Sequence, residues 1–129
     1  MNSSLDTNVL LRYILNDVPE QTRKAVKLLG DESQIFHVSD VVIAEVIFNL
    51  QIAELSRKDI AEVLMKVLSL PNMVANELVI DKVLPYFVEH PALSFVDCLS
   101  AFEAEAQGAE PLWTFDKKLA NQHPNAKRL

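Results

Sequence analysis

Apolar and polar positions follow two different periods along the chain, and these periods predict strands that alternate with helices. Short apolar runs predict four strands, over residues 1–5, 34–38, 72–75 and 112–115. Apolar residues three or four positions apart predict helices over residues 9–15, 19–29, 41–55, 57–70, 77–89 and 95–107, and over a short segment after residue 116. Strands that alternate with helices are typical of the α/β class, with a parallel sheet covered by helices on both faces.

Four side chains in these elements carry specific expectations. The segment 41–55 is apolar on nearly every face, which predicts a buried helix. Glu45 lies within it and is therefore expected to be buried, paired either with a basic side chain or with a cation. Asn49, one turn further on, is expected to bond to another helix, and Trp113 is expected in the core. Pro85 should kink or end its helix.

Composition favours one domain that covers residues 1–129, because half of the residues are apolar and no repeat or linker is visible. A single cysteine, Cys98, fits a reducing compartment, and neither a signal peptide nor a membrane-spanning stretch is visible. We therefore expect a cytoplasmic protein. The net charge of -6 opposes general binding to nucleic acid, although two bound divalent cations would reduce it to -2.

Four carboxylates stand at similar points of the predicted pattern. Asp6 and Asp116 directly follow strands, Asp97 lies in a first helical turn, and Glu45 lies near one. Each aspartate taken alone is more often a helix cap than a metal ligand. Together they share the rim where parallel strands end and helices begin, which is where ligand sites form. Oxygen ligands without histidine or cysteine suit Mg²⁺ or Mn²⁺, and such cations suit phosphoryl chemistry.

Neighbouring polar residues add to this candidate site. Thr7 and Thr114 stand beside acidic positions and could orient a carboxylate or a metal-bound water, although cap and strand hydroxyls are common. Arg12, Lys117 and Lys118 are the basic residues nearest the expected rim and could bind phosphate. The three histidines show no ligand spacing and are expected to be structural or on the surface.

Four short motifs then resemble the acidic motifs of the PIN-domain ribonucleases, in the same order. They are Leu-Asp-Thr-Asn-Val-Leu-Leu, Val-Ile-Ala-Glu-Val, Ser-Phe-Val-Asp-Cys-Leu-Ser-Ala and Trp-Thr-Phe-Asp-Lys-Lys-Leu. The resemblance implies a three-layer α/β/α sandwich with a parallel sheet of four or five strands. It also implies that Asp6, Glu45, Asp97 and Asp116 form a catalytic quartet that holds Mg²⁺ or Mn²⁺. Thr114 matches the hydroxyl residue before the last acid, and Asn8 matches a polar position of the toxin branch.

The length is similar to that of the single-domain toxins of VapC type. The resemblance therefore implies an endoribonuclease that cuts RNA, forms a homodimer and is silenced by a small antitoxin protein. An alternative is a PIN-fold interaction module without nuclease activity, which works through the helices after residues 40 and 56. A phosphatase or phospho-receiver domain is a third reading, but Asn8 stands where a phosphatase has its second aspartate.

Overall fold

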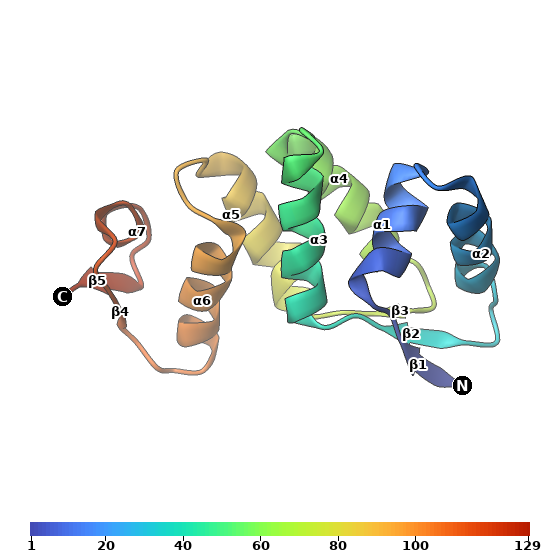
Figure 1. Cartoon of the computed structure of the whole chain (residues 1–129). Helices are drawn as coiled ribbons and strands as arrows, with labels where there is room; N and C mark the ends of the chain where they lie inside the picture. Colours follow the sequence, from blue (N-terminus) through green and yellow to red (C-terminus); the bar gives the residue numbers. More distant parts are fainter. The chain divides into compact units, whose positions relative to one another are not determined.

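The computed structural model describes all 129 residues, and these form two compact units, residues 1–76 and residues 77–129 (Figure 1). Each unit combines helices with a parallel sheet of its own. The α/β class predicted from the sequence is therefore confirmed. The five strands lie in two sheets, three in unit 1 and two in unit 2. None of the helices combines the length and the hydrophobicity that crossing a bilayer requires.

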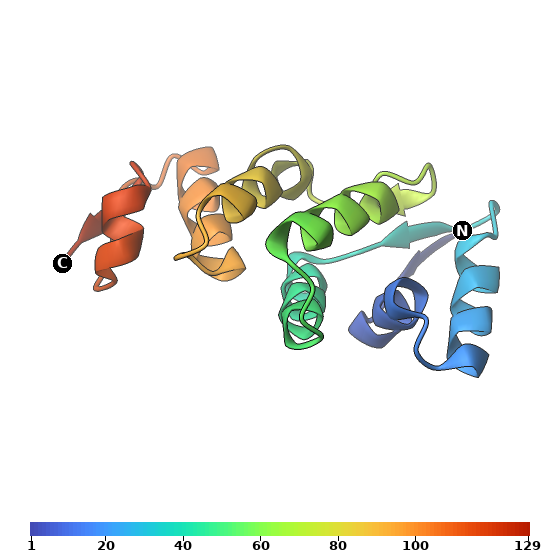
Figure 2. The same ribbon diagram turned by 90° about the horizontal axis from the view of Figure 1, so that it is seen from above.

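Unit 1 contains a three-stranded parallel sheet and four helices. In chain order its elements are β1 (Asn2–Ser4), α1 (Thr7–Leu15), α2 (Pro19–Leu29), β2 (Ile35–His37), α3 (Asp40–Ile52), α4 (Arg57–Leu68) and β3 (Met73–Val74). The strand order is β1-β2-β3. Figure 2 shows α1 and α2 lying side by side, as expected for two helices joined by a short turn.

The two faces of this sheet differ in burial. Ser3, Phe36 and Met73 are register partners across the three strands, and Phe36 is completely buried beneath the helices. Ile35 and His37 flank Phe36 and point to the opposite face, where both are exposed. This alternation follows from the two-residue period of a strand. Within unit 1 the helices thus lie on one face of the sheet (Figure 1).

Side-chain caps set where the helices begin, largely as the sequence predicts. Asp6 caps α1 through its carboxylate, and the hydroxyls of Ser39 and Ser56 cap α3 and α4. Pro19 stands in the first turn of α2, where a missing N–H costs nothing.

The prediction of a fully buried helix over residues 41–55 is wrong. Ile43, Val46, Ile47 and Leu50 fill the core, and the opposite side of α3 faces solvent. That exposed side carries Glu45 between the apolar residues Val41, Phe48 and Ile52. Because apolar residues lie on both faces of α3, the sequence pattern does not show which face packs against the core.

Unit 2 contains η1 (Val79–Val83), α5 (Leu84–Glu89), α6 (Phe95–Ala106), β4 (Leu112–Thr114), α7 (Lys117–Gln122) and β5 (Ala126–Arg128). The segment η1 is one π-helical turn, and the N–H of Leu84 bonds to the carbonyl of Val79, five residues earlier. This wider turn leads directly into Pro85, which has no N–H to offer. The expected disturbance at Pro85 is therefore a change of helix type just before it.

The C-terminal strand β5 pairs in parallel with β4 and was not predicted. Its sequence, Ala-Lys-Arg, lacks the apolar alternation by which a strand is recognised. Helix α7 connects the two strands, and the ring of His123 at its end is buried against Tyr86 and Phe102. The expectation that Trp113 lies in the core is wrong, since this β4 side chain is 55% exposed.

Candidate active site

A cleft of about 790 Å³ lies at the carboxyl ends of all three strands of unit 1. Its lining comes mainly from residues 4–6, 37–40 and 74–76, which follow β1, β2 and β3. The carboxyl ends of parallel strands share one edge of a sheet, and ligands commonly bind there. Asp6 lines this cleft, which lies at the rim of the sheet where the sequence predicts a ligand site.

Asp6 and Glu45, 39 residues apart in the chain, are linked through Thr7. The Asp6 carboxylate accepts the backbone N–H of Thr7 through Oδ1 at 2.8 Å. The buried hydroxyl of Thr7 donates to Oε2 of Glu45, also at 2.8 Å. Thr7 therefore fixes the orientation of the Glu45 carboxylate relative to the start of α1.

The expectation that Glu45 is buried is wrong, because Glu45 is exposed. Of the two partners expected for it, a basic side chain is not found, since no lysine or arginine pairs with Glu45. Asn49 does not bond to another helix as predicted. Its amide donates back to the carbonyl of Glu45 within α3, at 2.8 Å. This contact leaves the Glu45 carboxylate untouched.

Asp97 lies in the first turn of α6, and its carboxylate is half-buried without a hydrogen bond or an ion pair. The helix is capped by Ser94, whose hydroxyl accepts the backbone N–H of Asp97 at 3.1 Å. In a full capping box the carboxylate of Asp97 would also accept the backbone N–H of Ser94, and this second bond is absent. Capping therefore does not occupy this carboxylate.

Asp116 caps α7 and is held in place by Thr114. Its Oδ1 accepts the backbone N–H groups of Lys118 and Leu119, at 2.8 and 3.3 Å. The Thr114 hydroxyl accepts the backbone N–H of Asp116 at 3.0 Å and so fixes the turn between β4 and α7. Asp116 and Asp97 are both in unit 2, and no hydrogen bond connects them.

Each of the four carboxylates keeps at least one oxygen that accepts no hydrogen bond. In Asp6 and Asp116 only Oδ1 accepts the bonds that cap the helix. In Glu45 only Oε2 accepts a bond, from the hydroxyl of Thr7. Neither oxygen of the Asp97 carboxylate has a hydrogen-bond partner. A carboxylate can thus cap a helix and still ligate a cation. The donor set is all oxygen, which fits a hard cation such as Mg²⁺ or Mn²⁺. Within either unit alone, no group of three acidic, histidine or cysteine side chains forms a ready metal site.

Asp40 is a further acid in the cleft that the sequence reasoning did not select. It lies in the first turn of α3 and lines the same cleft as Asp6, and its Oδ2 accepts the amide of Asn76 at 3.0 Å. The signal was present, because Asp40 follows a strand closely, as Asp6 does. The Asp40 carboxylate is not needed as a cap, because the hydroxyl of Ser39 caps α3.

Asn8 lies outside this cleft. It is exposed and lines a separate groove of about 320 Å³ between α1 and α2, together with Arg12. Arg12 itself pairs with Asp17 at 3.0 Å, so the guanidinium is held within unit 1. The structure therefore gives neither residue a contact with the acidic positions.

The parallel strands and the capped helices define an α/β protein in which Asp6, Asp97 and Asp116 each lie at the start of a helix. The chain belongs to the PIN domain family, whose model matches residues 4–122. This match spans both units and contains all four acids. PIN domains are generally nucleases that act on RNA or DNA with divalent metal ions, and they often pair with antitoxins. No curated protein and no solved structure matches the chain.

Proposed function

We propose that this protein is a metal-dependent endoribonuclease, the toxin of a type II toxin–antitoxin pair and a member of the VapC type. It acts in the cytoplasm, as a homodimer that a small antitoxin silences. The observation that carries the proposal is the family match over residues 4–122, which contains Asp6, Glu45, Asp97 and Asp116 in the expected order. We further propose that units 1 and 2 form one domain, since a single family match runs through both.

We assign the quartet Asp6, Glu45, Asp97 and Asp116 to holding Mg²⁺ or Mn²⁺. A cation bound there supplies an activated water and neutralises charge that develops on the phosphate. The residues of the chain contribute orientation: Thr7 fixes Glu45, the α1 cap fixes Asp6, and Thr114 fixes the turn that carries Asp116. The free oxygen on each acid supports this assignment.

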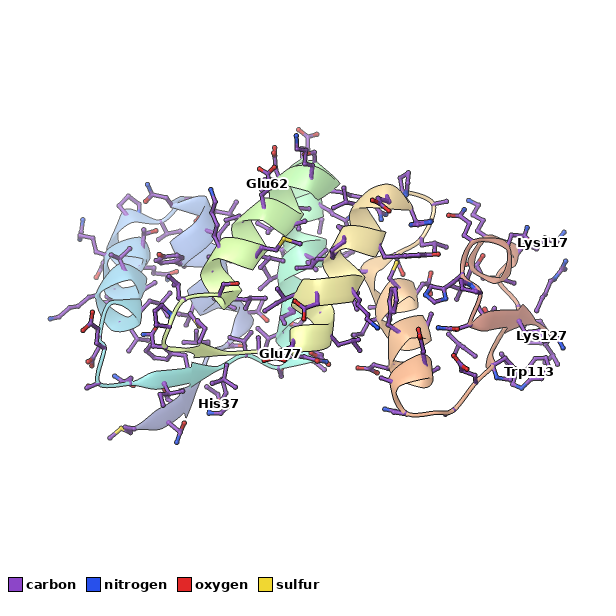
Figure 3. The ribbon with its side chains drawn as sticks, turned by 180° about the vertical axis from the view of Figure 1, so that it is seen from behind. His37, Glu62, Glu77, Trp113, Lys117 and Lys127 are labelled. Atoms are coloured by element: carbon purple, nitrogen blue, oxygen red, sulfur yellow. The ribbon has the colours of Figure 1, made fainter.

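The test replaces Asp97 by asparagine, which keeps the side-chain shape and removes the charge. We expect Mn²⁺-dependent cleavage of single-stranded RNA to fall at least 100-fold, because a ligand of the cation loses its charge. Glu62→Gln is the matched control: Glu62 is an exposed acid on α4, outside the quartet (Figure 3). Full activity of the Asp97 variant would contradict the catalytic assignment.

An interaction module without nuclease activity is the second candidate, and the exposed side of α3 favours it. Val41, Phe48 and Ile52 are 69%, 63% and 64% exposed on that side. Adjacent exposed apolar residues often mark a surface for another protein. The cleavage assay separates the two candidates, because a module shows no RNA cleavage in Mn²⁺ with any variant, including the unaltered chain.

A further inference from the structure

Positive charge is concentrated at the C-terminal end of unit 2. Residues 111–129 contain four basic side chains and one acidic one, hence a formal side-chain charge of +3. The preceding 110 residues carry eight basic and seventeen acidic side chains, hence -9. The acidic average of the whole chain therefore conceals a basic segment that contains β4, α7 and β5, just as it conceals residues 21–30, which carry three basic side chains and no acidic one.

One basic side chain of this segment lies over an exposed aromatic ring. Trp113 and Lys127 are register partners on β4 and β5, and the Lys127 ammonium lies 5.6 Å from the centre of the indole ring. Trp113 is 55% exposed, and Phe115, two residues on, is 75% exposed. Figure 3 shows Trp113 and Lys127 next to each other on the two strands, with Lys117 on α7.

The other face of the two strands explains why these side chains point outward. Ala126 is buried and Leu112 is partly buried, and Leu119 of α7 is buried as well. The two-residue period of the strands then directs Trp113 and Lys127 to the opposite face, toward solvent. Lys117, Lys118 and Arg128 are exposed too, and no acidic side chain pairs with any of them.

We propose that Trp113, Phe115, Lys117, Lys118 and Lys127 form a binding platform for single-stranded RNA. Bases stack on aromatic rings whatever their identity, and nearby cations contact the phosphates between them. Lys127 approaches the indole ring and leaves more than half of Trp113 free, so a base and a cation can share this ring. A duplex keeps its bases stacked inside, so this chemistry selects single strands.

This inference rests on the proposed ribonuclease function and names how the substrate strand is held. Asp116 directly follows Phe115, so a strand stacked on the platform passes beside one acid of the proposed quartet. The platform also offers a positive surface on a chain of net charge -6, since the phosphates would meet a segment whose side chains sum to +3.

The test uses Trp113, the only tryptophan of the chain, as its own reporter. Fluorescence is titrated with a single-stranded oligouridylate in EDTA, where no cleavage takes place. We expect saturable quenching of the Trp113 emission, and much weaker quenching with an RNA duplex. Affinity should fall with salt with a log–log slope of about -2.1 for three contacts, since each contributes roughly -0.7 on a single strand.

The double variant Lys117→Ala/Lys127→Ala should bind at least tenfold more weakly and reduce that slope to about -0.7, because two of the three phosphate contacts are lost. Lys58→Ala/Lys66→Ala removes two exposed lysines of α4 and should change neither quantity. In an anisotropy assay with labelled RNA, Trp113→Ala should weaken binding and Trp113→Phe should restore most of it.

Unchanged Trp113 emission on adding RNA, or equal losses in the two double variants, would overturn the platform. A surface that instead binds a protein gives the first of these results. The proposed nuclease function is judged separately, by cleavage with the Asp97 variant in Mn²⁺. The binding assay can therefore support the platform even if the cleavage assay contradicts the quartet. The cleavage assay can likewise support the quartet even if the binding assay contradicts the platform.

Discussion

The hydroxyl of Thr7 joins two acids that are far apart in the sequence. It donates to Glu45 at 2.8 Å, and the backbone N–H of the same residue donates to Asp6. A side chain that orients a metal ligand typically changes metal affinity or activity by about 10- to 100-fold when it is removed.

We therefore expect Thr7→Val, which keeps the branched shape and loses the hydroxyl, to raise the Mn²⁺ concentration needed for half-maximal cleavage by about 10- to 100-fold. Thr7→Ser should restore the wild-type requirement, because it returns the donor. The two variants are compared by cleavage over a series of Mn²⁺ concentrations. An unchanged Mn²⁺ requirement in Thr7→Val would remove Thr7 from the positioning of Glu45.

His123 is a second single residue with a definite consequence. Its ring is 2% exposed, and its Nδ1 accepts the backbone N–H of Asn125 at 3.1 Å, so the proton of the neutral ring lies on Nε2. That Nε2 is buried without a partner. Burial lowers the pKa of His123, the nearby Glu105 opposes this, and His90 adds to it.

The sign of the pH dependence follows from this lowered pKa. The unfolded chain takes up a proton at His123 near the ordinary pKa of about 6.5, and the folded chain does so only at lower pH. The contribution to stability is therefore complete above about pH 6.5. It decreases as the pH falls toward the folded pKa, by at most about 1.4 kcal/mol per pH unit.

His123→Phe keeps a ring among Tyr86 and Phe102 but removes the titration. We expect the variant to be less stable than the wild type at about pH 8, since the bond to Asn125 is lost, and less sensitive to acid below about pH 6.5. Urea unfolding at several pH values measures both effects. An equal acid sensitivity in variant and wild type would assign the effect to other groups.

At the scale of elements, the sequence predicts those parts whose signals are local. Asp6 before α1, Pro19 in α2, Ser56 before α4 and Ser94 before α6 mark helix starts, because a cap is written into neighbouring residues. Strand β5 escapes such reasoning. It has no apolar alternation, and its pairing with β4 is a contact between distant residues.

The side of a helix that packs is likewise not a local property. Helix α3 has apolar residues all around, and only the packing of Ile43 and Leu50 into the core leaves Glu45 exposed. The candidate site has the same limit. The sequence suggests each acid through its place after a strand or in or near a first helical turn. The bond from Thr7 to Glu45 joins residues 38 positions apart, and no local signal predicts it. The joint quartet remains a proposal.

At the scale of the whole molecule, the proposal that the two units form one domain has a direct test. Phe36 is completely buried in β2 of unit 1, and the single tryptophan, Trp113, reports on unit 2. A Phe→Ala change in a core typically costs about 3–5 kcal/mol.

If the chain is one cooperative domain, Phe36→Ala lowers the urea midpoint seen by Trp113 fluorescence as much as the one seen by circular dichroism. Phe36→Leu, which leaves less empty space, should lower both midpoints by a smaller amount. A Trp113 transition that does not move while the circular dichroism transition shifts or splits would show two units that unfold independently.

The uneven distribution of charge has a practical consequence for anyone who purifies this protein. Its calculated isoelectric point of about 5.0 would lead to an anion-exchange column at neutral pH. Resins that carry sulfated polysaccharide would retain it as well, because the final 19 residues present +3 to the matrix. Its retention on both chromatographic media depends on where the charges lie and not on their total.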